Sequence, residues 1–207
     1  MFQLECYQEQ LLKLHDHICP RQVLGLRMGE WAGDLLRLRL PQADKRLIAF
    51  TETDGCFADG IMVATGCALG HRTLRLEDQG KVAVTFVDTR TRRAVRIRPH
   101  PLARQHAARY ATAQSRWHAQ LAAYQTLPVD ELLCACPVEL VVPIEAIVSR
   151  PGVRVTCAVC GEEIINEREV VRAGMILCRS CAGEGRYYRE VGEALSSVAA
   201  IAEAEPT

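Results

Sequence analysis

Two Cys-x-x-Cys pairs near the C-terminus constrain the fold of this chain more than any other feature. The pairs are CAVC (157–160) and CRSC (178–181), and 17 residues separate them. Each pair curls two sulfur atoms towards one point, and two pairs at this spacing are typical of a zinc site with Zn–S distances of about 2.3 Å. We therefore predict a structural zinc site with four thiolate ligands: Cys157, Cys160, Cys178 and Cys181.

The segment around these cysteines is predicted to be a small treble-clef-like zinc finger. The chain between the pairs fits a hairpin with a turn near Gly174, and the second pair is predicted to begin a terminal helix. A closed four-cysteine site usually holds together a segment too small to fold alone. Residues 150–207 carry seven basic and nine acidic residues, whereas a nucleic-acid reader is clearly basic. We therefore expect protein contact or self-association, and nucleic-acid binding is disfavoured.

Length and composition leave room for a second, larger domain. The chain has 207 residues, of which 49% are hydrophobic, so a sizeable core can form. The sequence SRPGVR (149–154) indicates a boundary, which gives domains 1–149 and 150–207. Basic and acidic residues balance at 25 each, so no overall charge attracts nucleic acid or anionic membranes.

The cellular location is predicted from what the sequence lacks. The N-terminal stretch does not read as a secretory signal, and no run of 18 apolar residues could span a membrane. A cytoplasmic protein is therefore expected. In a reducing compartment, ten cysteines indicate metal or redox chemistry rather than disulfides.

Hydrophobic periodicity predicts an α+β fold, with helices packed on a mostly antiparallel sheet. Two N-terminal helices are expected, and Gly25 and Gly29 on the second would allow another backbone to approach closely. The expected helices cover 3–14, 20–33, part of 54–70 and 101–126, and the expected strands lie within 46–53, 74–101 and 137–143.

Residues with metal-binding side chains gather in two stretches of the larger domain. His15, His17 and Cys19 alternate shortly before a helix, and Cys56 and Cys67 lie among glycines that permit tight turns. Clustered histidine and cysteine with such turns indicate a site for zinc or another transition metal. The alternative is a histidine that caps a helix or faces solvent, beside a buried cysteine.

Three segments of this domain carry a recognisable pattern: HDHICPRQVLGLRMG (15–29), ETDGCFADGIMVATGCALGHRTLRLEDQGKVAVTF (52–86) and AVRIRP (94–99). They resemble the FmdE family, which takes its name from a subunit of formylmethanofuran dehydrogenase. The pattern of that family reads roughly H-G-H-x-C-P-G, E-T-x-x-C-x-x-D-A-I-Q, T-G-C-T-x-G and D-x-G-K. The C-terminal cysteine module resembles a finger attached to many members. Arg21 stands where glycine is usual and Met62 where glutamine is usual, which puts the ligand or substrate in doubt.

The resemblance implies an α+β protein, often a homodimer, that binds a metal, commonly zinc, in its N-terminal domain. It also implies a candidate partner, a molybdenum or tungsten oxidoreductase that reduces carbon dioxide onto methanofuran. The dehydrogenase reaction itself is not expected of this chain. The sequence contains neither a dinucleotide-binding glycine fingerprint nor an iron–sulfur cysteine run.

Cysteine and histidine side chains suit zinc, so they supply the predicted N-terminal ligands. His15 is either a further ligand or a residue that orients one, and Asp59 could orient a ligating histidine by a hydrogen bond. Three protein ligands would leave a position for water, whereas four would indicate a structural or sensory site. The predicted ligands are His17, Cys19, Cys56 and Cys67.

The sequence favours a metal-binding accessory or regulatory protein, and leaves enzymatic activity open. One alternative is a zinc-dependent enzyme that acts on a small anionic substrate, with Glu52, Asp54 or Asp59 as its base. Eight arginines and no acidic residue lie between Thr89 and Val129, most densely in 90–109. This run is either an anion site or a solvated strand face. Together with the predicted zinc finger, it gives only weak support to a further alternative, a nucleic-acid-binding regulator.

Overall fold

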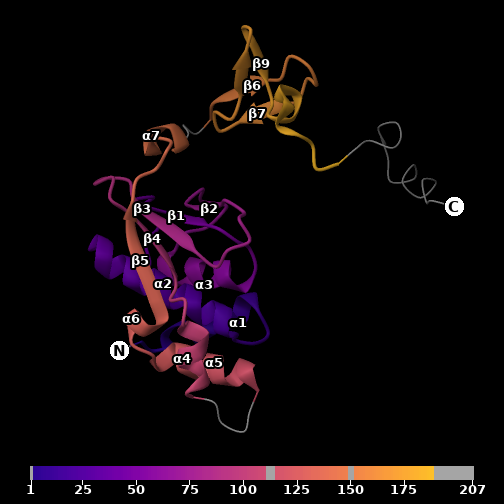
Figure 1. The fold of residues 1–207 in the computed structure, drawn as a ribbon. Coiled ribbons are helices and arrows are strands. Elements are labelled where there is room, and N and C mark those ends of the chain that lie inside the picture. Colours follow the sequence, from indigo (N-terminus) through magenta and orange to yellow (C-terminus); the bar gives the residue numbers. More distant parts are fainter. Residues whose placement is uncertain (1, 111–114, 149–151, 189–207) are drawn as a thin grey trace, which may run out of the picture. The chain divides into compact units, whose positions relative to one another are not determined.

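The computed structural model describes residues 2–110, 115–148 and 152–188. The chain divides into two compact units, Met1–Ile144 and Glu145–Thr207 (Figure 1). Within the described ranges, no helix is both long and apolar enough to cross a membrane.

The N-terminal unit is built on one five-stranded sheet with the order β2-β1-β3-β4-β5. Only β1 and β2 pair in parallel, and the other three pairs are antiparallel. This arrangement confirms the predicted α+β fold with a mostly antiparallel sheet. The strands are β1 (Leu47–Thr51), β2 (Leu74–Leu76), β3 (Val84–Asp88), β4 (Ala94–Pro99) and β5 (Leu133–Val138).

Helices cover one face of this sheet, and α2 lies between β4 on one side and α3 on the other. The core between these elements includes the fully buried side chains of Met28, Phe57 and Phe86. The helices of this unit are α1 (Glu5–Leu14), α2 (Pro20–Leu36), α3 (Cys56–Thr65), α4 (Ala103–Ala108), α5 (Arg116–Thr126) and α6 (Val129–Leu132). A further helix, α7 (Ile144–Ile147), lies at the boundary between the two units.

Glycines bring α2 and α3 into backbone contact, as predicted for Gly25 and Gly29. A Cβ atom at Gly25 would lie 2.4 Å from the carbonyl oxygen of Phe57, and one at Gly29 would lie 2.5 Å from the Cβ atom of Ala64. The contact advances in the same direction along both helices, so α2 and α3 run parallel. Their N-termini therefore lie at the same end of the pair.

Two predicted elements were wrong in extent. The helix expected over 101–126 is two helices, because α4 ends at Ala108 and Ser115 has the extended backbone of a residue that precedes a new helix. Residues 111–114 lie outside the described residues. The last strand is β5 rather than 137–143, because β4 begins at Ala94 and offers no partner beyond Val138.

A buried carboxylate holds the turn between β3 and β4. The side chain of Asp88 is fully buried and accepts hydrogen bonds from Arg46 Nη2 at 2.9 Å and from the Arg90 N–H at 2.9 Å. Burial alone would raise the pKa of Asp88, but Arg46, the Arg90 N–H and Thr91 hold it at about 2. The ionised form is therefore part of the folded structure.

Asp88→Asn is expected to lower the free energy of unfolding by about 2 kcal/mol at neutral pH, because it removes the ion pair with Arg46. A carboxylate with a lowered pKa stabilises the fold above its unfolded pKa of about 3.8, and this is lost as pH falls towards 2. The difference between wild type and variant should therefore shrink over that range. Urea unfolding at several pH values measures it, with the exposed Asp78→Asn as control. A difference independent of pH would contradict this account.

Residues 152–188 of the C-terminal unit contain two short hairpins and a helical turn. One hairpin pairs β6 (Arg154–Thr156) with β7 (Glu163–Ile165), and the other pairs β8 (Val170–Arg172) with β9 (Met175–Leu177). Gly174 has a φ of 79° in the turn of the second hairpin, as predicted. The helical turn is η1 (Ser180–Glu184). Of the predicted terminal helix, residues 186–188 are not helical and 189–207 lie outside the described residues.

Candidate functional site

The four C-terminal cysteines form a candidate metal site. Their sulfur atoms all lie within 4.8 Å of one another. Zn–S distances of about 2.3 Å give a tetrahedron with edges of about 3.8 Å. The Sγ atoms of Cys160 and Cys178 are 3.9 Å apart, close to that value. The clustering confirms that the predicted residues can reach one metal ion such as zinc.

Backbone amides prepare this cluster for negative charge. The N–H of Cys178 donates to Cys157 Sγ at 3.3 Å, and the N–H of Cys181 donates to Cys178 Sγ at 3.4 Å. Backbone donors from Cys160, Cys178 and Val159 lower the pKa of Cys157 to about 6. Its hydrogen bond with Cys178 raises the pKa of Cys181 to about 12. The cluster therefore binds protons unequally until a metal displaces them.

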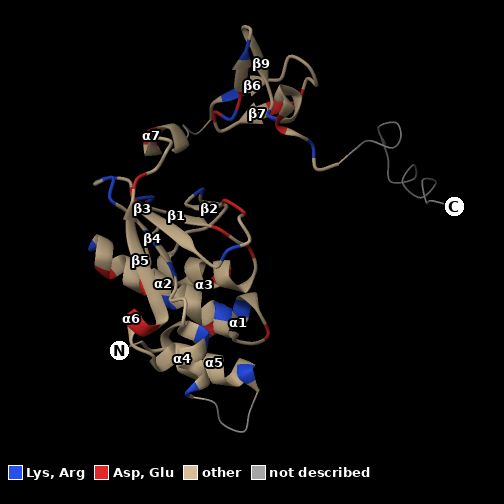
Figure 2. Ribbon diagram, viewed as in Figure 1, with Lys and Arg blue, Asp and Glu red and all other residues tan. Residues whose placement is uncertain are grey.

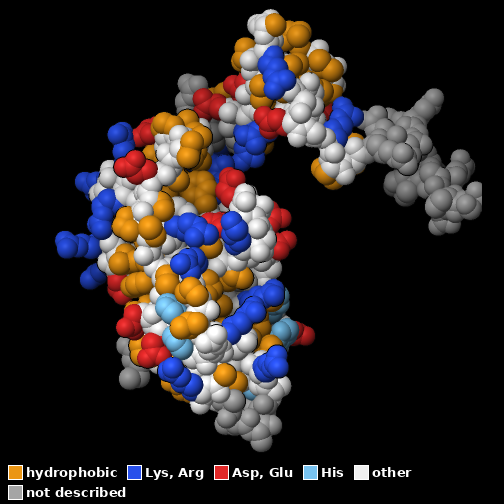
Figure 3. All heavy atoms as spheres, in the orientation of Figure 1, with side chains coloured by type: hydrophobic (Ala, Val, Ile, Leu, Met, Phe, Trp, Pro, Cys, Tyr) orange, Lys and Arg blue, Asp and Glu red, His pale blue; other side chains and the backbone are white. Residues whose placement is uncertain are grey.

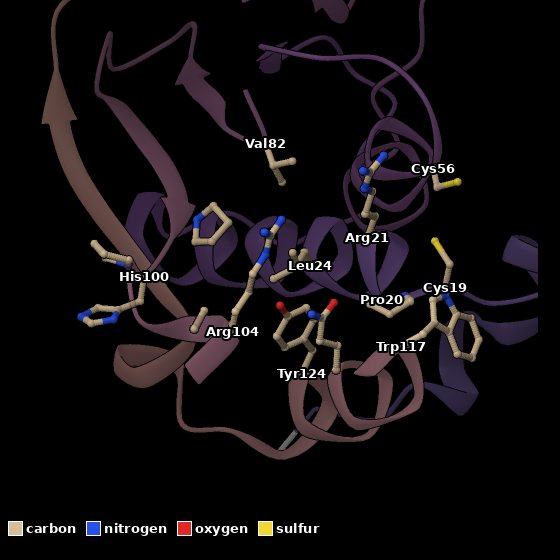
Figure 4. A pocket seen from close by; sticks show the side chains of 14 residues that line it. Cys19, Pro20, Arg21, Leu24, Cys56, Val82, His100, Arg104, Trp117 and Tyr124 are labelled. Atoms are coloured by element: carbon tan, nitrogen blue, oxygen red, sulfur yellow. The ribbon is translucent and has the colours of Figure 1, made fainter. Parts of the chain in front are cut away.

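In the N-terminal unit, the parallel helices α2 and α3 bring two thiols together. Cys19 directly precedes α2, where its N–H donates to Oε1 of Gln22 at 2.8 Å, and Cys56 is the first residue of α3. The two thiols lie close together at one end of a cavity lining (Figure 4). Burial raises the pKa of the Cys56 thiol, and Cys19 raises it further. The partial positive charge of a helix N-terminus favours a thiolate, and two such ends meet here.

Two histidines and a carboxylate lie near this thiol pair. Asp59 lies one helical turn after Cys56, and its Oδ2 is 2.6 Å from Nε2 of His15. The ring of His17 is 6.1 Å from that of His15, and its Nδ1 lies 2.7 Å from Oδ1 of Asp16. Asp59 thus pairs with His15, whereas the predicted ligand His17 pairs with Asp16.

Cys67 lies elsewhere. It follows the C-terminal end of α3, whereas Cys56 begins that helix, and ten helical residues span about 15 Å. Cys67 is 2% exposed and its Sγ lies 3.5 Å from the Leu47 carbonyl oxygen. Among the described residues, the only group of three or more ligand atoms within 4.8 Å of one another is the C-terminal one. The four predicted N-terminal ligands therefore do not form one cluster in the structure.

A cavity of about 710 Å³ opens beside Cys19 and Cys56. Figure 4 shows the two thiols at one end of the lining and His100 at the other, with Arg104 between them. Arg21 also lines it, as do the aromatic side chains of α5. The cavity thus combines thiols, positive charge and aromatic surface.

Most of these lining residues were missed in the sequence. Trp117, Gln120 and Tyr124 share one face of α5 at helical spacing, which does not reveal whether that face meets a core or a cavity. Tyr124 is 3% exposed and belongs to the core, whereas Trp117 is 40% exposed. The buried Arg27 joins α5 to α2 by donating to the carbonyl oxygens of Tyr124 and Leu127 at 2.8 and 2.9 Å.

The arginines of this run lie on several elements, in the turn between β3 and β4 and on β4, α4 and α5 (Figure 2). Arg96 on β4 makes a bidentate ion pair with Glu52, and Arg93 donates to the carbonyl oxygen of Leu35. Of the eight arginines, only Arg104 is among the described lining of the cavity. Since Glu52 is held by Arg96, Asp59 is the candidate base that lies beside the thiols.

Comparison with known proteins identifies the family. A family model described as "FmdE, Molybdenum formylmethanofuran dehydrogenase operon" matches residues 14–134, which is more than half of the chain. The chain belongs to the FmdE family. This finding confirms the resemblance drawn from the His-x-His-x-Cys and Thr-Gly-Cys motifs.

Two similar proteins extend the comparison. A curated protein from Archaeoglobus fulgidus, described as a probable S-adenosyl-L-methionine-binding protein, is 36% identical over 88 residues. The match covers 41% of this chain and 24% of that protein, so this chain spans about a quarter of its length. The crystal structure of an FmdE-like protein from Syntrophus aciditrophicus, named after tungsten formylmethanofuran dehydrogenase, matches with a TM-score of 0.54. It is 22% identical and covers 89% of this chain and 94% of that one, which supports the fold.

Proposed function

We propose that this FmdE-family chain is a metal-binding accessory or regulatory protein with two separate sites. The C-terminal unit would hold zinc through its four cysteines. The N-terminal unit would hold zinc or another transition metal through Cys19 and Cys56, completed by His15 or His17. The observation that carries the second site is the meeting of two thiols where α2 and α3 begin, at the end of a cavity.

The chemistry of the donor set supports this second site. Thiolate and imidazole are the ligands preferred by zinc and its neighbours among transition metals. The hydrogen bond that Asp59 accepts from the ring of His15 would fix the orientation of that ring, as carboxylates commonly do for metal-bound histidines. Metal binding would release protons from thiols, and the pKa of Cys56 is raised. Affinity is therefore expected to weaken as pH falls.

The cavity supports one alternative, a metal-dependent enzyme. A bound metal with an open position could activate water or polarise a carbonyl group of a ligand in the cavity. Asp59 would then be the candidate base, because it lies beside Cys56. The name of the curated relative is not carried over to this chain, because the match covers only 24% of that protein.

The proposal also includes partners. The operon named in the family description supports a molybdenum or tungsten oxidoreductase as partner. Figure 3 shows hydrophobic side chains on the surface of the C-terminal unit. Val171, Met175 and Ile176 of this unit are exposed, which supports a role in protein contact, including a homodimer. A cytoplasmic location would keep all ten cysteines reduced.

Cobalt binding tests the N-terminal site, because thiolates bound to Co²⁺ absorb in the near ultraviolet. We expect the full chain, loaded with one equivalent of zinc so that only the C-terminal site is filled, to gain this absorption on addition of one equivalent of Co²⁺. Cys19→Ser and Cys56→Ser should each remove most of it, while Cys67→Ser should retain it. An absorption that survives Cys19→Ser, or that is lost equally with Cys67→Ser, would contradict a site built on the thiol pair.

A further inference from the structure

We propose that the cavity beside Cys19 and Cys56 binds a small planar organic anion. The ligand would be an aromatic or heteroaromatic ring bearing a phosphate or carboxylate group. Its anionic group would meet Arg21 and Arg104, and its ring would lie against Trp117. The inference deepens the proposed function by naming the ligand class of the same site, and rests on that function for the role of the metal only.

The charged residues that line the cavity favour a ligand with negative charge. Arg21 and Arg104 line the cavity with His100, and the described lining contains no aspartate or glutamate. Within the described part of the chain, neither guanidinium has an ion-pair or hydrogen-bond partner, whereas Arg46 and Arg96 are each paired with a carboxylate. Two unpaired guanidinium groups in one cavity favour a carboxylate or phosphate, which each can bind by paired hydrogen bonds.

Aromatic surface determines the shape of the ligand. Trp117 is 40% exposed, and its ring faces the lining near Cys19 in Figure 4. Leu24 and Val82 add apolar surface to the same cavity. An indole ring that is left partly open in a cavity favours a planar group, because stacking buries both rings and retains favourable ring electrostatics.

Size and rigidity are consistent with a mononucleotide-sized molecule. Ligand sites commonly measure roughly 300–1,000 Å³, and this cavity measures about 710 Å³. Arg21 lies on the long helix α2, and the three hydrogen bonds of Arg27 fix α5, which carries Trp117, against α2. The helices that carry Arg21 and Trp117 are therefore fixed against each other before a ligand arrives.

Four compounds test the proposal on the full chain: adenosine monophosphate, nicotinate, adenosine and inorganic phosphate. We expect the first or second to quench tryptophan fluorescence, and to bind more tightly than adenosine or phosphate alone. Comparing the affinities of adenosine monophosphate and nicotinate shows whether the phosphate-bearing or the carboxylate-bearing compound is preferred. Trp117→Phe leaves Trp31 as the remaining tryptophan and should abolish the quenching.

Arginine variants identify the anion-binding groups. Arg21→Ala and Arg104→Ala should each weaken binding by about tenfold or more, as the loss of a charge-assisted hydrogen bond does. Arg116→Ala is the matched control, since Arg116 is exposed on α5 beside Trp117 but is not among the lining residues. Calorimetry measures each affinity, and circular dichroism confirms that each variant folds.

Two results would overturn the proposal: no binding of either ring-bearing anion at millimolar concentration, or an equal loss in the Arg116→Ala control. Metal content measured on the same samples separates this inference from the proposed function. Anion binding without an N-terminal metal would support the cavity as an anion site and contradict the proposed N-terminal metal site. An N-terminal metal without anion binding would leave the proposed function standing and defeat the inference.

Discussion

Removal of the metal from the C-terminal unit is expected to unfold residues 152–188. The buried core of this unit comprises Cys157, Ile164, Leu177 and Ala182. Such a core is too small to stabilise two hairpins whose strands are only three residues long. Metal binding contributes about 10 kcal/mol or more to the folding of comparable four-ligand units. Cys178→Ser should have the same consequence, because it removes one of the four ligands.

Amide chemical shifts of the full chain report this unfolding directly. In the metal-depleted protein and in Cys178→Ser, signals of β6 to β9 should collapse to random-coil positions, while those of β1 to β5 stay in place. The exposed Cys136→Ser, which lies outside the cluster, is the control and should leave both sets unchanged. Dispersed hairpin signals that persist without metal would contradict the account.

Gly60→Ala is expected to destabilise the N-terminal unit strongly. A Cβ atom there would lie 2.3 Å from the Gln22 carbonyl oxygen and 3.0 Å from the Gly25 Cα atom. Both contacts are with the backbone of a helix, so no flexible side chain can move aside. We expect a loss of about 3 kcal/mol or more, which exceeds the gain of about 1 kcal/mol in helix propensity.

Chemical denaturation of the N-terminal unit measures this effect, monitored by the amide signals of β1 to β5. Gly70→Ala is the control, because a Cβ atom there would meet nothing within 4 Å and the residue is outside the helices. Its free energy of unfolding should match wild type. An unchanged stability in Gly60→Ala would show that α2 and α3 can separate without cost. The same variant should also weaken N-terminal metal binding, because the contact aligns Cys19 with Cys56.

Local spacing explains why the C-terminal site was predictable. The positions of Cys157, Cys160, Cys178 and Cys181 follow from two short turns and one hairpin, so a linear pattern is sufficient. Helices with a strong start signal were likewise predictable, as at Pro20, which begins α2. The end of β5 was not, because it depends on where the partner strand β4 begins.

Tertiary contacts explain why the N-terminal site was predictable only in part. The sequence indicated Cys19 and Cys56, but the length of α3 separates Cys56 from Cys67. The sequence also suggested that Asp59 could form a hydrogen bond with a histidine, and in the structure this histidine is His15. Arg104 and Trp117 join the cavity because α5 packs against α2 and α4 packs against α5, which no local pattern encodes.

Metal content per chain, measured by elemental analysis, tests the central claim most directly. We expect two metal ions per wild-type chain and one per chain in Cys178→Ser, with the remaining ion lost when Cys19→Ser is added. One ion in wild type and none in Cys178→Ser would contradict the two-site assignment, because all tightly bound metal would then belong to the C-terminal cysteines.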